Sequence, residues 1–252
     1  MSFLAKLENR INATGSNLCV GLDIRAEKAD EATKRFAIRV IEETSAYAAA
    51  FKPNAAYFES LGWQGVRMLA QILKAVPKEI PIIYDAKRGD IGETQGYYAR
   101  AAFEEVGADA ITLNPYMGAE TLEPFLKYAD KGLYLLGVTS NPGAADIELQ
   151  ELASGGRVFQ KVAAMTQASK QIGLVVGLTN ASVDVLSHTP DVPLLIPGLG
   201  AQGGDLAALK GSQRKAPILV NVSRGILYSD PDLPLASRAK AWMEKLQYAM
   251  AD

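Results

Sequence analysis

Short apolar runs alternate with longer amphipathic segments along most of this chain, and this rhythm restricts its fold more than any other feature. Eight runs have the length and apolar character of buried β-strands; they are residues 18–23, 50–53, 80–85, 110–113, 132–138, 174–177, 193–197 and 218–222. Segments with helical periodicity lie between them, including 31–48, 64–75, 94–106, 157–171 and 234–250. This alternation of strand and helix predicts an α/β fold built on a parallel sheet.

The number of strands selects one architecture within that class. Eight strand–helix pairs in a chain of 252 residues are typical of a (β/α)8 or TIM barrel. An open, doubly wound sheet usually has fewer strands and a glycine-rich turn after the first one. Here the first strand ends in Gly21-Leu22-Asp23 without that fingerprint. No linker or low-complexity tract divides the chain, so we expect residues 1–252 to form a single domain.

Charged residues stand where the first three strands end. These are Asp23, Lys52, and Asp85 with Lys87. Loops that follow barrel strands build the active-site face, so these side chains are expected to meet at one rim. Side chains alternate along a strand, which points Asp85 and Lys87 the same way. A charge leaving an apolar strand also commonly marks the start of a loop. Four such charges in succession instead favour a site in which opposite charges offset the cost of burial.

Two glycine-rich loops follow the seventh and eighth strands, at residues 197–205 and 221–226. Glycine lets backbone N–H groups approach a phosphate, and arginine supplies a charged fork. The same two loops are the recurrent phosphate position in this fold. We therefore expect a phosphate site that includes Pro197 and Gly225, with Gln202 and Arg224 as side-chain contacts. The alternative is two glycine turns beside a solvated arginine.

The loop after the fifth strand is long and polar, running from residues 139–145 to the glycines at 155 and 156. A loop of this kind is suited to close over a ligand as a lid. An ordinary surface loop has the same composition, and both interpretations remain open.

Composition excludes several functional classes. The formal net charge of −2 argues against nucleic acid or an anionic membrane surface as a partner. No apolar stretch approaches the roughly 20 residues that span a bilayer, and residues 1–12 lack the apolar core of a signal peptide. The chain has a single cysteine, Cys19, so it can form no internal disulfide. Because Cys19 lies in an apolar run, we expect it to be a small buried hydrophobic residue. We therefore expect a cytoplasmic protein.

The sequence contains a single histidine, His188. A Ser-His-Asp triad would have to use it, and a metal cluster could contain one imidazole at most. The neighbours of His188 are typical of the end of a helix, so we assign it no catalytic role. The chemistry is expected from Asp, Lys and Arg side chains, with no cofactor and no metal.

The motif of residues 85–91, Asp-Ala-Lys-Arg-Gly-Asp-Ile, combines with Phe-Lys-Pro-Asn at 51–54 and with the glycine-rich loop at 197–205. Together they resemble the orotidine 5′-phosphate decarboxylase family, and the resemblance extends from the first strand to the eighth. It implies cofactor-independent decarboxylation of orotidine 5′-phosphate (OMP) to UMP, the last step of de novo pyrimidine nucleotide biosynthesis.

The resemblance also implies roles for individual residues. Lys87 would donate the proton and Asp85 would lie beside the substrate carboxylate, suggesting repulsion that decarboxylation relieves. Asp23 and Lys52 would hold ribose hydroxyls, and Ser140 would bond the pyrimidine.

Other residues would bind the phosphate or serve the neighbouring subunit. Gln202 and Arg224 would bind the 5′-phosphate. Asp90, with Ile91 and Thr94, would reach into the partner's site, so the active form would be a homodimer with shared sites.

The chemistry of the residues agrees with this reaction. Loss of CO₂ from an sp² ring carbon leaves an electron pair with little delocalisation, and the sequence shows no cofactor motif that would absorb it. A fixed ammonium stabilises that charge and then protonates the carbon.

Two rival functions stay open. Sugar-phosphate enzymes of the same suprafamily share the D-x-K-x-x-D pattern, but they use Mg²⁺ with an acidic ligand on the second strand, where Lys52 would repel a cation. A non-catalytic barrel that senses nucleotides is the other, although all four charged positions persist here.

Overall fold

The structure is a computed structural model that describes residues 1–179, 183–197 and 214–251. Within these residues one eight-stranded sheet runs in the order β2-β1-β8-β7-β6-β5-β4-β3, and every pairing is parallel. The strands are β1 (Leu18–Leu22), β2 (Ala50–Pro53), β3 (Ile83–Arg88), β4 (Ala110–Leu113), β5 (Gly132–Val138), β6 (Ile172–Val176), β7 (Leu194–Ile196) and β8 (Ile218–Val222).

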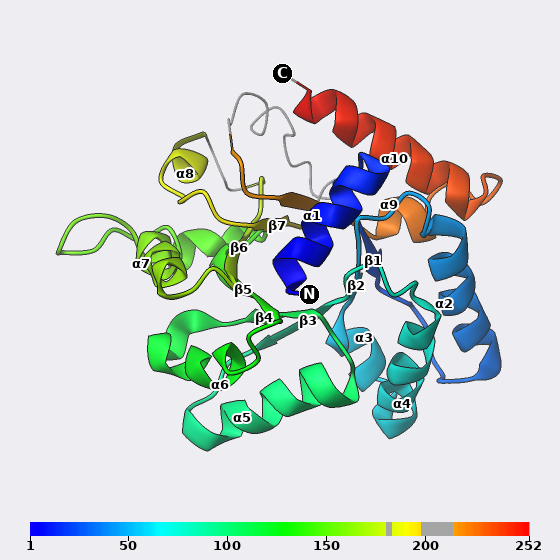
Figure 1. Ribbon diagram of the computed structural model, residues 1–252, viewed down its shortest axis with the longest axis horizontal. Coiled ribbons are helices and arrows are strands. Elements are labelled where there is room, and N and C mark those ends of the chain that lie inside the picture. Colours follow the sequence, from blue (N-terminus) through cyan, green and yellow to red (C-terminus); the bar gives the residue numbers. More distant parts are fainter. Residues whose placement is uncertain (180–182, 198–213, 252) are drawn as a thin grey trace.

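The first and last strands of that order meet and close the sheet. Parallel bridges join Phe51 to Ile82 and Asn54 to Asp85, and the Phe51 N–H donates to the Pro81 carbonyl at 2.9 Å. Helices surround the resulting barrel (Figure 1). The (β/α)8 barrel predicted from the sequence is confirmed.

The outer layer consists of helices of very different lengths. The α-helices after β1 are α2 (Glu31–Thr44), α3 (Ala55–Glu59), α4 (Gly62–Ile72), α5 (Gly92–Arg100), α6 (Glu123–Leu126), α7 (Val158–Met165), α8 (Val183–Ser187), α9 (Arg224–Leu227) and α10 (Leu235–Met250). Shorter turns are η1 (Leu73–Ala75), the π-helical η2 (Ala101–Glu105), η3 (Pro115–Met117), η4 (Ala119–Leu122), η5 (Pro142–Asp146) and η6 (Thr166–Ala168). None of the helices in the described ranges is long and apolar enough to cross a membrane.

Several predicted elements differ from the structure at their boundaries, and three examples illustrate this. The strand predicted at 80–85 begins at Ile83 and continues to Arg88. Its first residues include Pro81, which has no N–H to donate to a sheet ladder. The helices predicted at 31–48 and 157–171 end earlier, at Thr44 and Met165.

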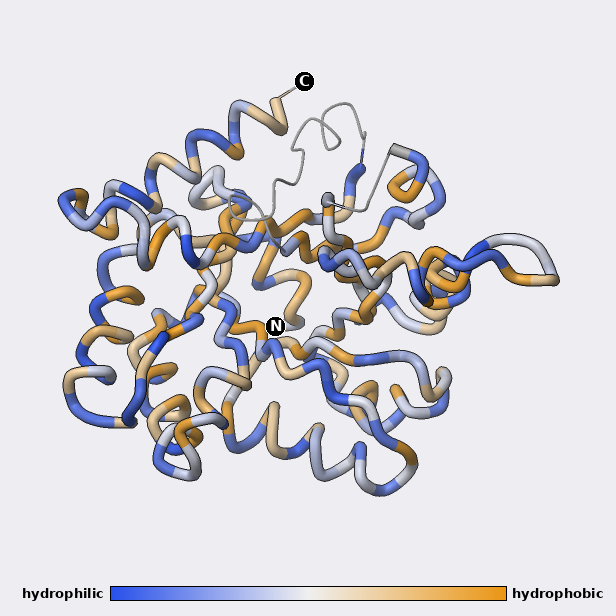
Figure 2. Tube along the Cα trace, turned by 180° about the vertical axis from the view of Figure 1, so that it is seen from behind, coloured by the Kyte–Doolittle hydropathy of each residue, from blue (hydrophilic) through white to orange (hydrophobic). Residues whose placement is uncertain are grey.

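The interior of the barrel is filled by side chains that point inward from the strands. Cys19, Ile83, Tyr134, Val175 and Leu219 belong to this cluster, whereas their neighbours along each strand pack outward against the helices. Figure 2 shows hydrophobic residues along the central strands and alternating character in the outer helices. Cys19 is fully buried, as predicted, and burial raises the pKa of its thiol to about 12.

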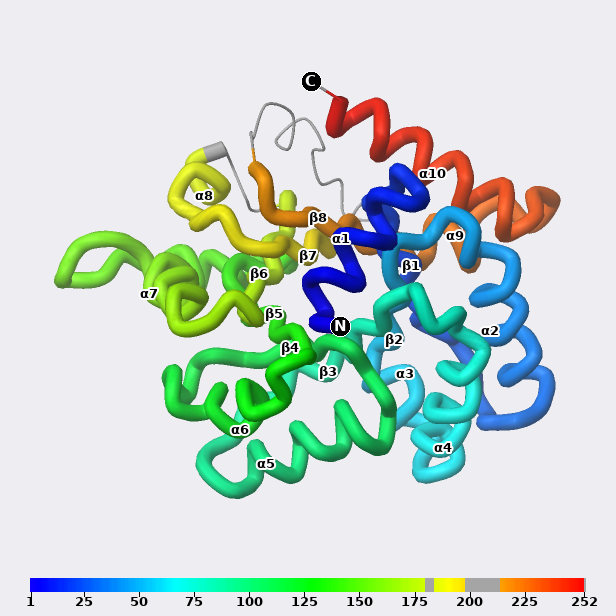
Figure 3. Tube along the Cα trace, viewed as in Figure 1, coloured from blue at the N-terminus to red at the C-terminus, as the bar shows by residue number. Residues whose placement is uncertain are grey.

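A helix that the sequence analysis did not predict, α1 (Phe3–Thr14), lies across one end of the barrel (Figure 3). Its buried Phe3 and Leu7 join the interior cluster. Gly132 makes this possible, because a Cβ atom there would lie 2.2 Å from the Phe3 ring. Since α1 covers the end where the strands begin, the opposite end remains for the site.

Candidate active site

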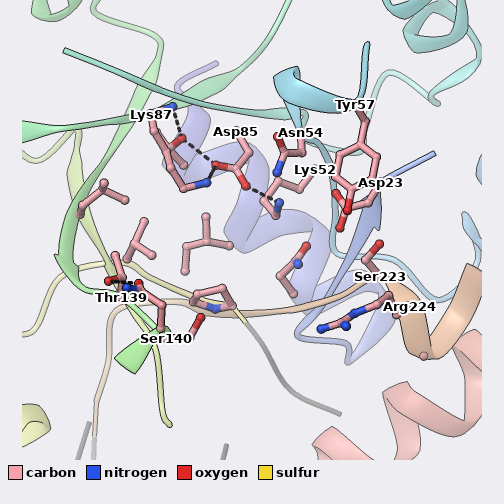
Figure 4. A pocket seen from close by; sticks show the side chains of 18 of the residues that line it. Asp23, Lys52, Asn54, Tyr57, Asp85, Lys87, Thr139, Ser140, Ser223 and Arg224 are labelled. Atoms are coloured by element: carbon pink, nitrogen blue, oxygen red, sulfur yellow. Dashed lines mark hydrogen bonds and ion pairs between the residues drawn. The ribbon is translucent and has the colours of Figure 1, made fainter. Parts of the chain in front are cut away.

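A cavity of about 460 Å³ opens at the carboxyl ends of the strands (Figure 4). Predicted site residues that line it are Asp23, Lys52, Asp85, Lys87, Ser140, Pro197, Arg224 and Gly225. Asn54, Thr139, Asn141, Asn221 and Ser223 also line it and lie in motifs or loops that the sequence analysis selected. Lining residues outside those motifs and loops are Arg25, Tyr57, Thr112, Leu136, Val175 and Leu195. The residues at the strand ends therefore meet in one cavity, as the barrel predicts.

A carboxylate shared by two ammonium groups forms the centre of the site. Lys52 Nζ lies 2.6 Å from Asp85 Oδ2, and Lys87 Nζ lies 2.6 Å from Asp85 Oδ1. Lys52 and Asp85 are buried, at 3% and 8% exposed, whereas the Lys87 side chain is 47% exposed. The Lys52–Asp85 pair is thus fixed inside the protein, and the Lys87 ammonium remains accessible to a ligand.

An irregularity in β3 determines how Lys87 reaches Asp85. The register between β3 and β4 shifts between Tyr84 and Arg88, and Lys87 has a φ of +48°. Positive φ is uncommon for residues other than glycine, and such strain is found at functional sites. Asp85 and Lys87 do share one side of the strand, as predicted, but a bulge rather than regular alternation brings them together.

Thr112, on β4, holds this bulge in place. Its hydroxyl donates to Asp85 Oδ1 at 2.9 Å and accepts from the Lys87 N–H at 3.0 Å. The only signal for Thr112 in the sequence is a polar residue within the apolar run of β4. Its partner lies 27 residues away, so the contact is visible only in the fold.

Electrostatics keep both buried groups charged. Burial disfavours the ammonium of Lys52, but the Asp85 and Asp23 carboxylates outweigh burial and raise its pKa. Burial likewise opposes the charged form of Asp85, and the Lys52 and Lys87 ammonium groups outweigh it, so the pKa of Asp85 lies well below its usual range. The charges of Lys52, Asp85, Lys87 and Asp23 cancel, and Arg25 and Arg224 make the cavity positive, which favours an anionic ligand.

Three buried oxygens lie where β1 and β8 end, on Asp23, Asn221 and Ser223. Within the described residues, Asp23 Oδ1, Asn221 Oδ1 and Ser223 Oγ have no hydrogen-bond partner. Gly21 allows this close approach, because a Cβ there would lie 2.7 Å from Ser223 Cβ. Buried polar atoms are normally paired, so this wall needs donors from water or a ligand.

Arginines occupy the side of the cavity formed by β8 and β1. Arg224 begins α9 directly after β8, and Arg25 follows β1. Tyr228 ties the two segments together, since its hydroxyl accepts from the Arg25 N–H at 2.7 Å and donates to the Asp23 carbonyl at 3.1 Å. The Arg25 guanidinium also stacks on the Tyr228 ring, 5.1 Å from its centroid. Gln202, the other predicted phosphate contact, lies outside the described residues.

Ser140 enters the cavity after β5. A Cβ on Gly177 would lie 2.7 Å from both the backbone nitrogen and the Cα of Ser140. Glycine at the end of β6 therefore lets the segment that carries Ser140 pack directly against the neighbouring strand.

Asp90, Ile91 and Thr94 do not line the cavity of their own chain. Asp90 Oδ1 accepts a hydrogen bond from the Ile91 N–H at 2.8 Å, and the Ile91 side chain is 63% exposed. Thr94 is exposed on the first turn of α5. His188 also lies away from the cavity, with Nδ1 3.2 Å from the Asp184 carboxylate on the surface.

A closed parallel barrel with a charged cavity at the carboxyl ends of its strands defines a (β/α)8-barrel enzyme. Residues 16–239 match the model of the Orotidine 5′-phosphate decarboxylase / HUMPS family, and the chain belongs to this family.

Named relatives match along almost the whole chain. The orotidine 5′-phosphate decarboxylase of Thermomicrobium roseum is 42% identical, covering 96% of this chain and 92% of the relative. That of Haloarcula marismortui is 42% identical, covering 92% and 89%. Among solved structures, the OMP decarboxylase of Leishmania donovani is 38% identical, with a TM-score of 0.87 over 99% of both chains.

Proposed function

We propose that this cavity decarboxylates OMP to UMP, with Lys87 as the proton donor. The observation that carries the proposal is the buried Asp85 carboxylate in contact with both Lys52 and Lys87 at 2.6 Å. Family membership and relatives named for this reaction support the same activity. The chain thus performs the final step of de novo pyrimidine nucleotide biosynthesis.

The chemical step follows from the position of Lys87. When the bond between the ring carbon and the carboxylate breaks, CO₂ leaves and the electron pair stays on the carbon. The Lys87 ammonium stabilises that charge and then transfers a proton to the same carbon. Lys87 regains a proton from water, which reaches its half-exposed side chain. Asp85, held by Lys52 and Thr112, keeps the ammonium aimed and lies beside the substrate carboxylate.

The two ends of the substrate are held by different walls of the cavity. Arg224 binds the 5′-phosphate, together with Gln202 and the backbone near Pro197 and Gly225. Ser140 bonds the pyrimidine at the opposite side of the cavity (Figure 4).

The ribose lies between these ends. Asp23 and Lys52 hold its hydroxyls. A ribose hydroxyl would donate to Asp23 Oδ1, a buried oxygen that has no hydrogen-bond partner among the described residues.

The active form is a homodimer in which Asp90, Ile91 and Thr94 serve the partner's site. Their position outside their own cavity supports this arrangement. The segments after β3 and β4 carry exposed apolar side chains; they are Ile91 and Tyr97 after β3, and Tyr116 and Met117 after β4. The segment after β4 lies beside the one after β3, because the Asn114 N–H donates to the Arg88 carbonyl at 2.8 Å. A second copy of the chain would cover this surface.

The reaction needs no metal or cofactor. Residues 1–252 form a single domain, and the enzyme acts in the cytoplasm. Lys52 supports metal independence, since its buried ammonium occupies the end of β2 and would repel a divalent cation. The buried free thiol of Cys19 is consistent with a reducing compartment.

The test is to follow the pyrimidine absorbance of OMP with purified protein in excess EDTA. We expect full turnover to UMP. Activity that requires Mg²⁺ would favour a sugar-phosphate enzyme of the same family. Binding of UMP with no turnover of OMP would favour a nucleotide sensor.

A further inference from the structure

We propose that Glu148 is a positioning residue that holds Ser140 in place for the pyrimidine end of the substrate. The inference rests on the proposed function, in which Ser140 contacts the base. Glu148 lies in the connection between η5 and α7, outside the group of residues that line the cavity. It acts through Thr139, the residue immediately before Ser140.

The carboxylate of Glu148 contacts both polar groups of Thr139. Its Oε2 accepts from the Thr139 N–H at 2.7 Å, and its Oε1 lies 2.8 Å from the Thr139 hydroxyl, which has a second acceptor in Asn141 Oδ1 at 2.7 Å. Hydrogen bonds to a carboxylate are shorter and stronger than neutral ones. The bond from the N–H fixes the backbone of Thr139 and therefore the direction in which the chain enters Ser140.

Glu148 is itself held from the other side. Its carbonyl accepts from the Phe159 N–H, in the first turn of α7, at 2.9 Å. The next residue, Leu149, donates its N–H to the Ala144 carbonyl at 3.1 Å. Glu148 therefore connects the end of β5 to α7 across a connection that the sequence suggested as either a lid or an ordinary loop.

Ser140 also has a direct contact with the end of β6, because the missing side chain of Gly177 lets the Ser140 backbone lie against it. Its position therefore depends on this glycine contact and on the clamp formed by Glu148 and Thr139. Removing the clamp should release the base contact and leave the phosphate contact, since Arg224 is carried by α9 after β8.

The experiment compares two ligands that differ in the base. Dissociation constants for UMP and for ribose 5-phosphate are measured by calorimetry for the wild type, Glu148→Ala and Glu148→Gln. The matched control is Glu151→Ala, because Glu151 is exposed in the same connection. We expect Glu148→Ala to weaken UMP roughly tenfold and ribose 5-phosphate by less than about twofold. Glu148→Gln should fall between it and the wild type, since one oxygen remains to accept from Thr139. Glu151→Ala should bind both ligands as the wild type does.

Unchanged UMP binding in Glu148→Ala would overturn the proposal, and so would an equal loss for both ligands, which would indicate general loosening. If Glu148→Ala does not fold, as judged by circular dichroism, Glu148→Gln replaces it in the test. The proposal then requires a smaller loss of affinity for UMP, with ribose 5-phosphate binding unchanged. Ser140→Ala separates this inference from the function on which it rests. Selective loss of UMP binding in Ser140→Ala but not in the Glu148 variants would overturn only the positioning role. Failure of the wild type to decarboxylate OMP would overturn the proposed function.

Discussion

The Lys87 ammonium contacts the oxygen of Asp85 that faces away from Lys52, so one buried carboxylate separates two positive charges. The two lysines differ in exposure, and this difference gives them different roles. Lys52 is sealed inside the barrel and fixes Asp85, whereas the Lys87 side chain is 47% exposed and can meet a substrate.

Asp85→Asn should destabilise the protein by about 3–5 kcal/mol, because it removes the only carboxylate that contacts the buried ammonium of Lys52 in the described residues. The free energy of unfolding is measured by urea denaturation at pH 7. Asp184→Asn is the matched control, since its ion pair with Arg157 is exposed and should contribute at most about 1 kcal/mol. Equal, small effects of both substitutions would contradict a buried ion pair at Asp85.

The same variant should reveal a dependence of stability on pH. The pKa of Asp85 is lowered in the folded protein, so its contribution is fully present above the unfolded pKa of about 4 and is lost as the pH falls further. The difference in unfolding free energy between wild type and Asp85→Asn should therefore narrow below about pH 4. It should stay constant between pH 6 and pH 8. A difference that stays the same as the pH falls below about 4 would show that the pKa of Asp85 is not lowered.

Gly177→Ala should displace Ser140, because the added Cβ would lie 2.7 Å from its backbone. We expect KM for OMP to rise about tenfold or more, with a smaller change in unfolding free energy than a core cavity would cause. Gly96→Ala, in α5, has open space around the new Cβ and serves as the control. Equal KM values for the two variants would contradict the conclusion that Gly177 determines the position of Ser140.

Mixed dimers test whether Asp90 serves the neighbouring subunit. Asp90→Ala and Lys87→Ala chains are each expected to be nearly inactive alone. In a heterodimer with shared sites, one site would hold both intact residues, so random mixing should restore about a quarter of the wild-type activity. Coexpression with two affinity tags isolates the heterodimer. Absence of any recovery would place Asp90 within its own subunit's site.

The strands were predictable because each is a short apolar run whose burial needs no knowledge of distant residues. The barrel rule then placed Asp23, Lys52 and Asp85 at one rim, and the structure confirms that they share a cavity. Those parts of the site follow from local pattern and fold geometry alone.

The remainder depends on contacts between segments far apart in the sequence. Helix α1 docks because Gly132 leaves room for Phe3, a pairing that no local pattern reveals. The bulge at Lys87 is fixed by Thr112 on the next strand, and the Glu148 clamp becomes visible only when the connection after β5 is folded. Gln202, predicted from its glycine-rich loop, remains a prediction outside the described residues.

Lys87 carries the central claim, and its removal tests that claim most directly. The measurement is turnover of OMP to UMP by Lys87→Ala, with Lys127→Ala, on the exposed end of α6, as the control. The account predicts that Lys87→Ala lowers kcat by many orders of magnitude, keeps the circular dichroism spectrum of the wild type and still binds UMP. Near-normal kcat in Lys87→Ala would contradict the assignment of Lys87 as the proton donor.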